Sequence, residues 1–324
     1  MKHLTTAMFM ASTLLAAPAA RAGQYTIEVI DFPGADFTVL MGLSNNGNLA
    51  GYYRLPGDSA DRGFRRRNGA LEPVLAAGQP FGQALDINDD ARSVGTCPQA
   101  FCPANGYQWY LGGTQSQPLF GASNWRPEGL SERIETTGYL TMNGVPSGFV
   151  WDTQGLRLVN VPGALTTNVR NINASGMMVG SFTTGSGGPV AWGSFLSDGQ
   201  QFTTLNYPGM ADTIATGIND AATVVGFASD NVGAWVGWVR QPDGAYSEFT
   251  IPGARVVTPE DINNRGQIAG YFLDSAGVSH GFLATPVPEP ATGALLAAGL
   301  VALGWRRRHA GAQQRSMAPA GDLS

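Results

Sequence analysis

Four asparagines hold the same place in a recurring sequence pattern, and their side chains are the first that could bind a ligand. Each follows an isoleucine and stands seven residues before a glycine, and they are Asn88, Asn173, Asn219 and Asn263. Around a central channel, their amides would offer hydrogen-bond donors and acceptors to a ligand. Asparagine also bonds to nearby backbone groups and tolerates left-handed backbone conformations. We therefore expect these residues to cap turns, and ligand binding is the alternative.

Aromatic residues form a second series that could interact with a ligand, because sugar rings stack on flat aromatic faces. The recurring members are Trp109, Trp151, Phe195 and Trp238. In a repeated fold, periodic aromatics are expected to fill the core between neighbouring units. Trp125 lies outside this series, so it is the aromatic residue that we expect to be exposed and available to a ligand.

Cys97 and Cys102 are the only two cysteines of the chain. In an exported protein a disulfide between them is expected, and closing so short a loop would stabilise the fold by roughly 2 kcal/mol. A zinc centre would need four ligands. Between positions 23 and 288 the sequence has one histidine, His280, so we expect no metal site.

The residue types do not indicate a catalytic site. His280 is the only histidine of the central part of the chain, and no G-x-S-x-G nucleophile motif occurs. The acidic pairs Asp89-Asp90 and Glu132 with Glu135 are expected to be solvated turn residues. The segment that holds Asp89 and Asp90 lacks the 12-residue pattern of a calcium loop. We assign no catalytic residue and no cofactor.

Six sequence repeats of about 44 residues determine how these side chains are positioned. The recurring pattern ends on Gly51, Gly95, Gly138, Gly180, Gly226 and Gly270, with spacings of 44, 43, 42, 46 and 44 residues. A second glycine series lies in Pro-Gly or equivalent turns and has the same spacings. Its members are Gly34, Gly78, Gly121, Gly163, Gly209 and Gly253.

Each repeat has room for four short strands, as the fifth repeat illustrates. Its expected strands are Thr213–Ile218, Thr223–Ala228, Trp235–Arg240 and Tyr246–Ile251. Asp243-Gly244 joins the last two as a hairpin turn, because both residues favour positive φ. Four antiparallel strands per repeat make one propeller blade. We therefore predict an all-β fold, a six-bladed β-propeller, over residues 23–286.

The two ends of the repeat region predict how the ring closes. Tyr25–Ile30 precedes the first repeat and matches the fourth strand of a unit, whereas the sixth repeat stops at its third strand, around Phe282. Pairing these two segments would close the ring without an exposed splice, whereas an open stack would leave unpaired sheet edges, which are an aggregation hazard.

The N-terminal segment has the features of a secretory signal peptide. Lys2 supplies the positive start, an apolar stretch follows, and Ala20 and Ala22 form an A-x-A cleavage site. Cleavage would remove residues 1–22 and make Gly23 the first residue of the exported protein.

The C-terminal segment has three features in a fixed order. Pro288, Glu289 and Pro290 precede the uncharged stretch Ala291–Trp305, and Arg306, Arg307 and Arg308 follow. A helix of these 15 residues would be roughly 22 Å long, which is short for a hydrocarbon core of about 30 Å. The arginines predict that residues 310–324 form a cytoplasmic tail.

Residues 287–309 therefore resemble the PEP-CTERM sorting signal. The resemblance implies an inner-membrane intermediate that an exosortase, a membrane protease, recognises and cleaves. It also implies a Gram-negative bacterium that secretes exopolysaccharide. Residues 310–324 extend past the arginines, where such tails usually stop.

The repeats between Tyr25 and Leu283 resemble the HAF family of extracellular repeats. His280-Gly281-Phe282-Leu283 is the nearest match to the His-Ala-Phe motif, and Gly148-Phe149 is a related pair. This resemblance implies a repeat architecture and extracellular placement, and it implies no catalytic residues.

Composition limits the classes of partner. Charged residues are 13% of the chain, about half the usual share, and the 44 glycines suit a turn-rich protein. Without residues 1–22 and the tail from Glu289, 13 basic and 22 acidic residues remain, a net charge of −9. We therefore expect no binding to nucleic acid. The sequence predicts a non-enzymatic binding or structural protein of the cell-surface polysaccharide. The alternative is a glycan hydrolase or lyase with acids at the central channel.

Overall fold

The computed structural model describes residues 25–74, 82–96, 106–110, 113–115, 122–185 and 191–287. These residues form strands and turns, and no helix among them has the length and hydropathy of a membrane span. The expected signal peptide, the sorting segment from Pro288 onward, Cys97 and Cys102 lie outside the described residues.

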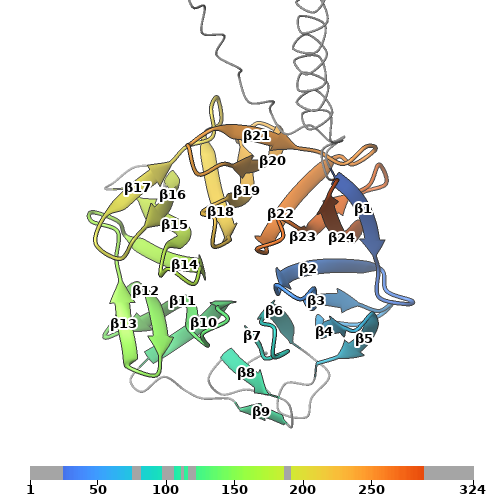
Figure 1. The fold of residues 1–324 in the computed structure, drawn as a ribbon, viewed down its shortest axis with the longest axis horizontal. Coiled ribbons are helices and arrows are strands. Elements are labelled where there is room, and N and C mark those ends of the chain that lie inside the picture. Colours follow the sequence, from blue (N-terminus) through green and yellow to red (C-terminus); the bar gives the residue numbers. More distant parts are fainter. Residues whose placement is uncertain are drawn as a thin grey trace, which may run out of the picture. The chain divides into compact units, whose positions relative to one another are not determined.

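The described strands form six four-stranded sheets that surround a common axis (Figure 1). The strands nearest the axis are β2 (Phe37–Leu43), β6 (Gln83–Ile87), β10 (Ala122–Leu130), β14 (Thr166–Ile172), β18 (Asp212–Ile218) and β22 (Val256–Ile262). The second strands are β3 (Leu49–Arg54), β7 (Ser93–Thr96), β11 (Thr136–Met142), β15 (Met178–Thr184), β19 (Val224–Ser229) and β23 (Ile268–Leu273). The third strands are β4 (Arg62–Arg67), β8 (Gly106–Tyr110), β12 (Val145–Asp152), β16 (Ala191–Ser197), β20 (Trp235–Arg240) and β24 (Ser279–Pro286). The outer strands are β5 (Ala70–Pro73), β9 (Gly113–Gln115), β13 (Gly155–Val159), β17 (Phe202–Leu205), β21 (Tyr246–Phe249) and, in the last sheet, β1 (Tyr25–Ile30).

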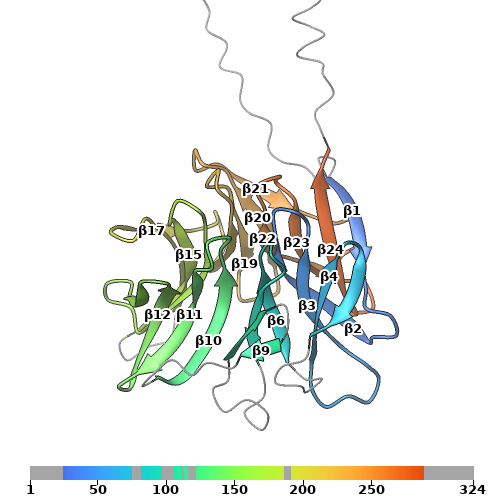
Figure 2. The same ribbon diagram turned by 60° about the horizontal axis from the view of Figure 1, so that its bottom comes forward.

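The chain builds one sheet after another, and consecutive strands within a repeat are antiparallel. Figure 2 shows the strands running between the two faces of the ring, with the connecting turns at those faces. The all-β propeller class predicted from the sequence is confirmed.

The ring is closed by the two ends of the repeat region. Tyr25–Ile30 pairs with β24, which contains Phe282, and this predicted pairing is confirmed. His280 Nδ1 lies 2.8 Å from Asp31 Oδ2 across this seam. The closing sheet is therefore held by side chains as well as by strand pairing.

The repeat glycines are explained by close packing around the second strands. Gly226 of β19 pairs with Ala215 on one side and with Trp238 on the other. A Cβ atom at Gly226 would lie 2.0 Å from the Ile214 carbonyl oxygen and 2.6 Å from the Trp238 ring. A side chain cannot be accommodated there.

The aromatic opposite this glycine is a core residue in the sheets where its side chain is described. These fully buried residues are Phe64, Phe149, Phe195, Trp238 and Phe282. The predicted core positions Phe195 and Trp238 are confirmed. Trp151 is half-buried two residues beyond Phe149, and the side chain of Trp109 lies outside the described residues.

The hairpins between third and outer strands include two types of turn, a two-residue turn and a longer loop. Asn68 and Gly69 have φ values of 50° and 80°, as the predicted two-residue turn requires. At Asp243-Gly244, only the glycine has positive φ, 93°, and Gln241 N donates to Ala245 O at 2.8 Å. The expectation of two positive φ values is therefore wrong there, because the longer loop places its left-handed residue only at glycine.

Trp125 is buried, so the expectation that it is exposed is wrong. Its side chain is 1% exposed and packs in a tilted arrangement on Phe149 and edge-on against Trp151, with ring centroids 6.1 and 6.4 Å apart. Trp125 does not belong to the recurring aromatic series because that series lies on the third strands, whereas Trp125 lies on the innermost strand β10. An inner-strand side chain that points between sheets enters the core as well.

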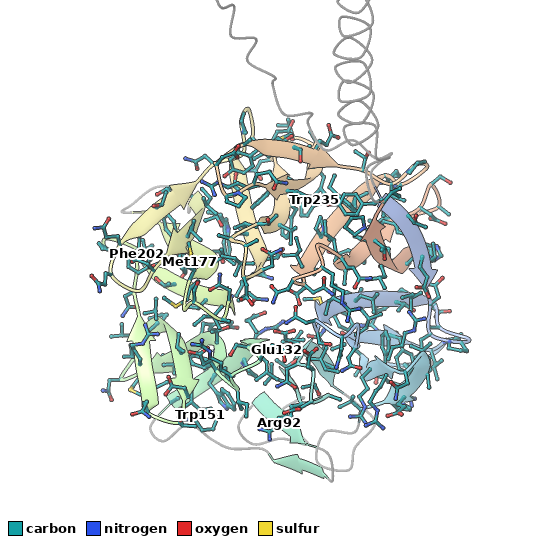
Figure 3. All side chains as sticks on the ribbon, viewed as in Figure 1. Arg92, Glu132, Trp151, Met177, Phe202 and Trp235 are labelled. Atoms are coloured by element: carbon teal, nitrogen blue, oxygen red, sulfur yellow. The ribbon has the colours of Figure 1, made fainter. Side chains whose placement is uncertain are left out.

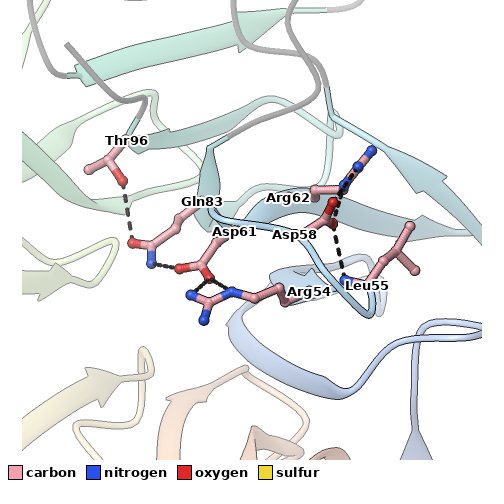
Figure 4. A network of polar contacts seen from close by, with 7 residues as sticks. All are labelled: Arg54, Leu55, Asp58, Asp61, Arg62, Gln83 and Thr96. Atoms are coloured by element: carbon pink, nitrogen blue, oxygen red, sulfur yellow. Dashed lines mark hydrogen bonds and ion pairs between the residues drawn. The ribbon is translucent and has the colours of Figure 1, made fainter. Parts of the chain in front are cut away.

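A polar network joins the first two sheets (Figure 4). It lies at the strand ends opposite the turns between the innermost and second strands, which we call the inner turns. Asp61 accepts a hydrogen bond from Arg54 Nε at 3.1 Å and another from Gln83 Nε2 at 2.7 Å. Thr96 donates to Gln83 Oε1 at 3.3 Å. Gln83 therefore connects the first sheet to β7 of the second.

Candidate functional site

A cavity of about 320 Å³ lies at one end of the axis, where the six inner strands end. Its wall includes the last residue of each inner strand: Leu43, Ile87, Leu130, Ile172, Ile218 and Ile262. The volume is within the range of small-molecule sites. The aliphatic wall arises because each repeat supplies one leucine or isoleucine at the same place.

The residue before each of these aliphatic residues alternates between glycine and a polar residue. In chain order they are Gly42, Asp86, Gly129, Asn171, Gly217 and Asp261. A Cβ atom at Gly42 would lie 2.5 Å from Asp86 Oδ1, and one at Gly217 would lie 2.9 Å from Asp261 Oδ1. Gly42 and Gly217 therefore leave the space that the neighbouring aspartate side chain occupies.

Asp261 joins three sheets at the cavity floor. Its Oδ2 accepts the Leu43 backbone N–H at 2.8 Å, and its Oδ1 accepts the Ile262 N–H at 2.8 Å. The same Oδ1 accepts Asn171 Nδ2 at 3.0 Å. Both carboxyl oxygens are therefore used to hold the first, fourth and sixth sheets together.

Asp86 has the matching role between the second and third sheets. Its Oδ2 accepts the Leu130 N–H at 2.6 Å, and its Oδ1 accepts the Ile87 N–H at 2.7 Å. Burial raises the pKa of Asp86 well above its ordinary value, and the negative charge of Asp261 adds to this. Burial also raises the pKa of Asp261 to about 7. The cavity floor therefore holds two carboxyl groups whose charge is disfavoured by their surroundings.

Below the floor, the bulged residues of the inner strands bring further charges together. Glu260 is buried, which raises its pKa to about 8, and its Oε2 lies 3.8 Å from Arg170 Nη1. Arg126 Nε donates to Glu128 Oε1 at 2.7 Å. The ion pairs partly offset the cost of burying these groups.

The recurring asparagines cap the inner turns, as expected. Asn219 Oδ1 accepts the Thr223 N–H at 3.0 Å, and Asn173 Oδ1 accepts the Met177 N–H at 3.0 Å. Asn88 and Asn263 make the same contact with the residue four positions ahead.

The same asparagines also connect neighbouring sheets, which the sequence did not indicate. Asn173 Nδ2 donates to the Asn219 carbonyl at 3.0 Å, and Asn219 Nδ2 donates to the Asn263 carbonyl at 3.2 Å. Asn263 Nδ2 in turn donates to the Ser44 carbonyl at 3.1 Å. Asn88 differs, because its buried Nδ2 has no hydrogen-bond partner among the described residues.

The rim of the cavity is a ring of mostly acidic and amide side chains. Its members are Asn45, Asp89, Glu132, Ala174, Asp220 and Asn264. Glu132, at the central opening in Figure 3, accepts the Asp89 N–H at 2.8 Å. Asn264 accepts the Asp220 N–H at 2.8 Å. Asp89 and Glu132 are thus part of the cavity rim, and not only solvated turn acids.

The cavity offers acceptors and amides around an aliphatic wall. Within the described ranges, no three histidine, cysteine, aspartate or glutamate side chains form a group that could hold a metal ion. Asp261, Asn171 and Glu260 were not singled out from the sequence. The aligned repeats carried one signal for Asn171 and Asp261, the alternation of glycine with polar residues before the recurring leucine or isoleucine, and they carried none for Glu260.

These features define a propeller with a polar axial cavity. Comparison with known protein families adds information on the localisation of the protein. Residues 286–308 match the family described as the PEP-CTERM protein-sorting motif. This motif indicates an exported protein that passes through the membrane and becomes associated with the cell surface. The search of curated proteins gives no match.

Solved structures resemble the chain in fold. The putative TolB from Agrobacterium tumefaciens has a TM-score of 0.52 and 10% identity, over 82% of this chain and 99% of that chain. TolB from Acinetobacter baumannii has a TM-score of 0.51 and 14% identity, over 74% of this chain. The chain spans 64% of the length of that protein. At such identities the likeness shows the propeller fold alone.

Proposed function

We propose that this chain is an exported, non-enzymatic propeller that an exosortase-type protease sorts to the cell surface of a Gram-negative bacterium. There it works as a binding or structural component of the extracellular polysaccharide. The observation that carries the proposal is the PEP-CTERM match at residues 286–308, which begins at the last residue of the last propeller strand. The resemblance of the repeats to HAF extracellular repeats supports the same placement.

A binding role is supported by the inner-turn face. The axial cavity of about 320 Å³ is lined by amides, carboxylates and backbone of all six repeats. Polar groups of this kind can exchange hydrogen bonds with sugar hydroxyls. A rigid ring of sheets holds them in place without a ligand, which lowers the entropic cost of binding.

The alternative function is a glycan hydrolase or lyase, and one observation favours it. Asp86 and Asp261 lie in the cavity with raised pKa values, as acids in catalysis often do. Their oxygens, however, accept backbone N–H groups that connect sheets. A carboxyl held in this way is poorly placed to exchange a proton with substrate, so we favour the binding role.

The sorting part of the proposal is tested by the replacement Glu289→Ala in the native host. The wild-type protein should accumulate outside the inner membrane without its C-terminal segment. The Glu289→Ala protein should remain full-length in the membrane fraction. Asp322→Ala, which changes the other acid of the tail, is the matched control and should behave as wild type. Wild-type protein that retains residues 291–324 at steady state would show an ordinary membrane anchor.

The binding part is tested by incubating the protein with matrix polysaccharide from its host. Co-sedimentation without release of reducing ends or unsaturated products would support binding. Product release by the wild type, with loss of that activity in Asp261→Asn, would support the enzyme.

A further inference from the structure

A second hollow, of about 460 Å³, lies beside the axial cavity at the seam where the ring closes. We call it the seam groove. It is formed by the inner turns of the first and sixth sheets, the β4–β5 hairpin, β1 and β24, and Asp89 lines both the groove and the axial cavity. β1 and the first sheet lie side by side in Figure 1. The groove therefore continues from the cavity across the same face.

The seam groove gathers positive charge on an acidic protein. Arg66, Arg67 and Arg265 all line it, although the exported part of the chain has a net charge of −9. Arg66 forms an ion pair of 2.8 Å with Glu28, and Arg67 Nη2 lies 3.6 Å from Glu72. Arg265 is exposed and forms no ion pair with any described residue. The guanidinium groups are suited to a carboxylate, which they bind with paired hydrogen bonds.

The rest of the lining consists mainly of amide and carboxylate side chains, whose types can exchange hydrogen bonds with hydroxyls. Four amide residues line the groove, namely Asn46, Asn48, Asn68 and Gln267. The amides of Asn46, Asn48 and Gln267 also each donate at least one hydrogen bond within the protein. Glu28 and Asp89 add carboxylate acceptors, and Leu283 is the one large apolar residue in the lining. Amides both donate and accept, whereas carboxylates accept from hydroxyls. This mixture matches a molecule that carries several hydroxyls and an isolated negative charge.

We propose that the seam groove binds a uronic-acid unit of an acidic polysaccharide. The carboxylate of the sugar lies against the arginines, and its hydroxyls lie against the amides and the two acids. The proposal rests on the proposed function and specifies its ligand class. A densely charged polyanion, such as polyphosphate, fits less well because Glu28 and Asp89 would repel it.

The test is isothermal titration of the full-length protein with oligomers of galacturonic acid, at low salt. Neutral malto-oligosaccharides of the same length are the comparison ligand. One variant, Arg66→Gln with Arg67→Gln, removes two charges but also the ion pair to the closing strand. A second variant, Arg265→Gln, loses no described ion pair and so preserves the fold. The control is Arg157→Gln with Arg255→Gln, which changes two exposed arginines outside the groove.

Wild type and control should bind the galacturonate oligomers, and both groove variants should bind at least about tenfold more weakly, since charge-assisted hydrogen bonds are lost. Binding should also weaken with added salt. Equal binding of galacturonate and neutral oligomers, or equal affinity of Arg265→Gln and wild type, would overturn the groove proposal. If host matrix polysaccharide still binds in that case, the proposed function stands. If the wild type binds no glycan of either kind, nor the host polysaccharide, both proposals are wrong.

Discussion

Asn171 and Asp261, 90 residues apart in the chain, are joined by a hydrogen bond of 3.0 Å from Nδ2 to Oδ1 at the floor of the axial cavity. The Oδ2 atom of the same carboxyl accepts the Leu43 N–H of the first sheet. One side chain therefore links three sheets near the axis. Such a contact needs a closed ring, because the three strands that supply it are not neighbours in the chain.

The buried acids at the axis predict that the propeller loses stability as the pH rises. Burial raises the pKa of Glu260 to about 8 and that of Asp261 to about 7. A buried acid whose pKa is higher in the folded state than in the unfolded state stabilises the fold fully at pH values below its unfolded-state pKa, near 4. This contribution to stability is then lost as the pH rises through the folded value. The free energy of unfolding, measured with urea, should be lower at pH 9 than at pH 5.

Glu260→Gln tests this origin, because glutamine resembles the protonated acid. The variant should match wild type at pH 5 and be more stable at pH 9, by at least about 1 kcal/mol. Burial lowers the pKa of His280, but hydrogen bonding and charge from acidic neighbours, chiefly Asp31, outweigh this and raise it. The contribution of His280 to stability is therefore also lost as the pH rises, equally in wild type and variant. An equal loss in wild type and variant would show that Glu260 does not contribute.

Asn219 makes two kinds of hydrogen bond, one that caps its own turn and one to the next sheet, and we expect their contributions to stability to be separable. Ser44 and Ser131 hold the equivalent place in the first and third repeats, and Ser44 Oγ caps its turn at 3.0 Å. Asn219→Ser should therefore keep the cap and lose the bond to the next sheet. We expect a loss of about 1 kcal/mol in thermal unfolding. Asn219→Ala should lose more, because it also removes the cap. Equal stability of the two variants would contradict this division.

Replacing Ile134 should stabilise the protein, because its backbone conformation is unfavourable for isoleucine. Ile134 has φ 67°, a left-handed conformation that strains a β-branched side chain. The equivalent turn residue in the fourth repeat is Gly176, with φ 83°. Ile134→Gly should raise the free energy of unfolding by about 0.5–1 kcal/mol, whereas Gly176→Ala should lower it. A lower melting temperature for Ile134→Gly would mean that the isoleucine contacts outweigh the strain.

Ring closure can be weakened at one glycine. A Cβ atom at Gly281 would lie 2.6 Å from the Ile30 carbonyl oxygen of β1. Gly281→Ala should therefore disturb the pairing of β1 with β24 and lower the melting temperature. Gly63→Ala is a matched control at the same place in the first repeat, where the nearest atom is Ala84 N at 3.2 Å. Faster hydrogen exchange in Tyr25–Ile30 should accompany the first change only, and an equal effect of both would contradict the closure explanation.

The cysteine pair remains a prediction from the sequence. Cys97 and Cys102 should be bonded in the exported protein, because both lie in a segment that reaches an oxidising compartment. Alkylation without reductant, followed by mass spectrometry, should leave both residues unlabelled. Labelling of both thiols would exclude the disulfide.

The amino-acid sequence determined the features that repeat along the chain. Strand positions, turn places and the pairing of Tyr25–Ile30 with the last repeat follow from spacing, because they depend on neighbours within about 44 residues or on the phase of the repeat. The capping role of Asn219 could be predicted for the same reason, since its acceptor contact is only four residues away.

Only the tertiary structure decided which side chains meet within and between sheets. Trp125 is buried because it packs on Phe149 and Trp151 of β12, two strands away in its own sheet. Asp261 lies against Asn171 because the ring brings their repeats to one axis. The seam groove combines Glu28 of β1 with Arg265 of the sixth repeat and exists only after closure. Repeat spacing specifies the register inside each sheet, whereas contacts across the axis depend on how the sheets are placed in the ring.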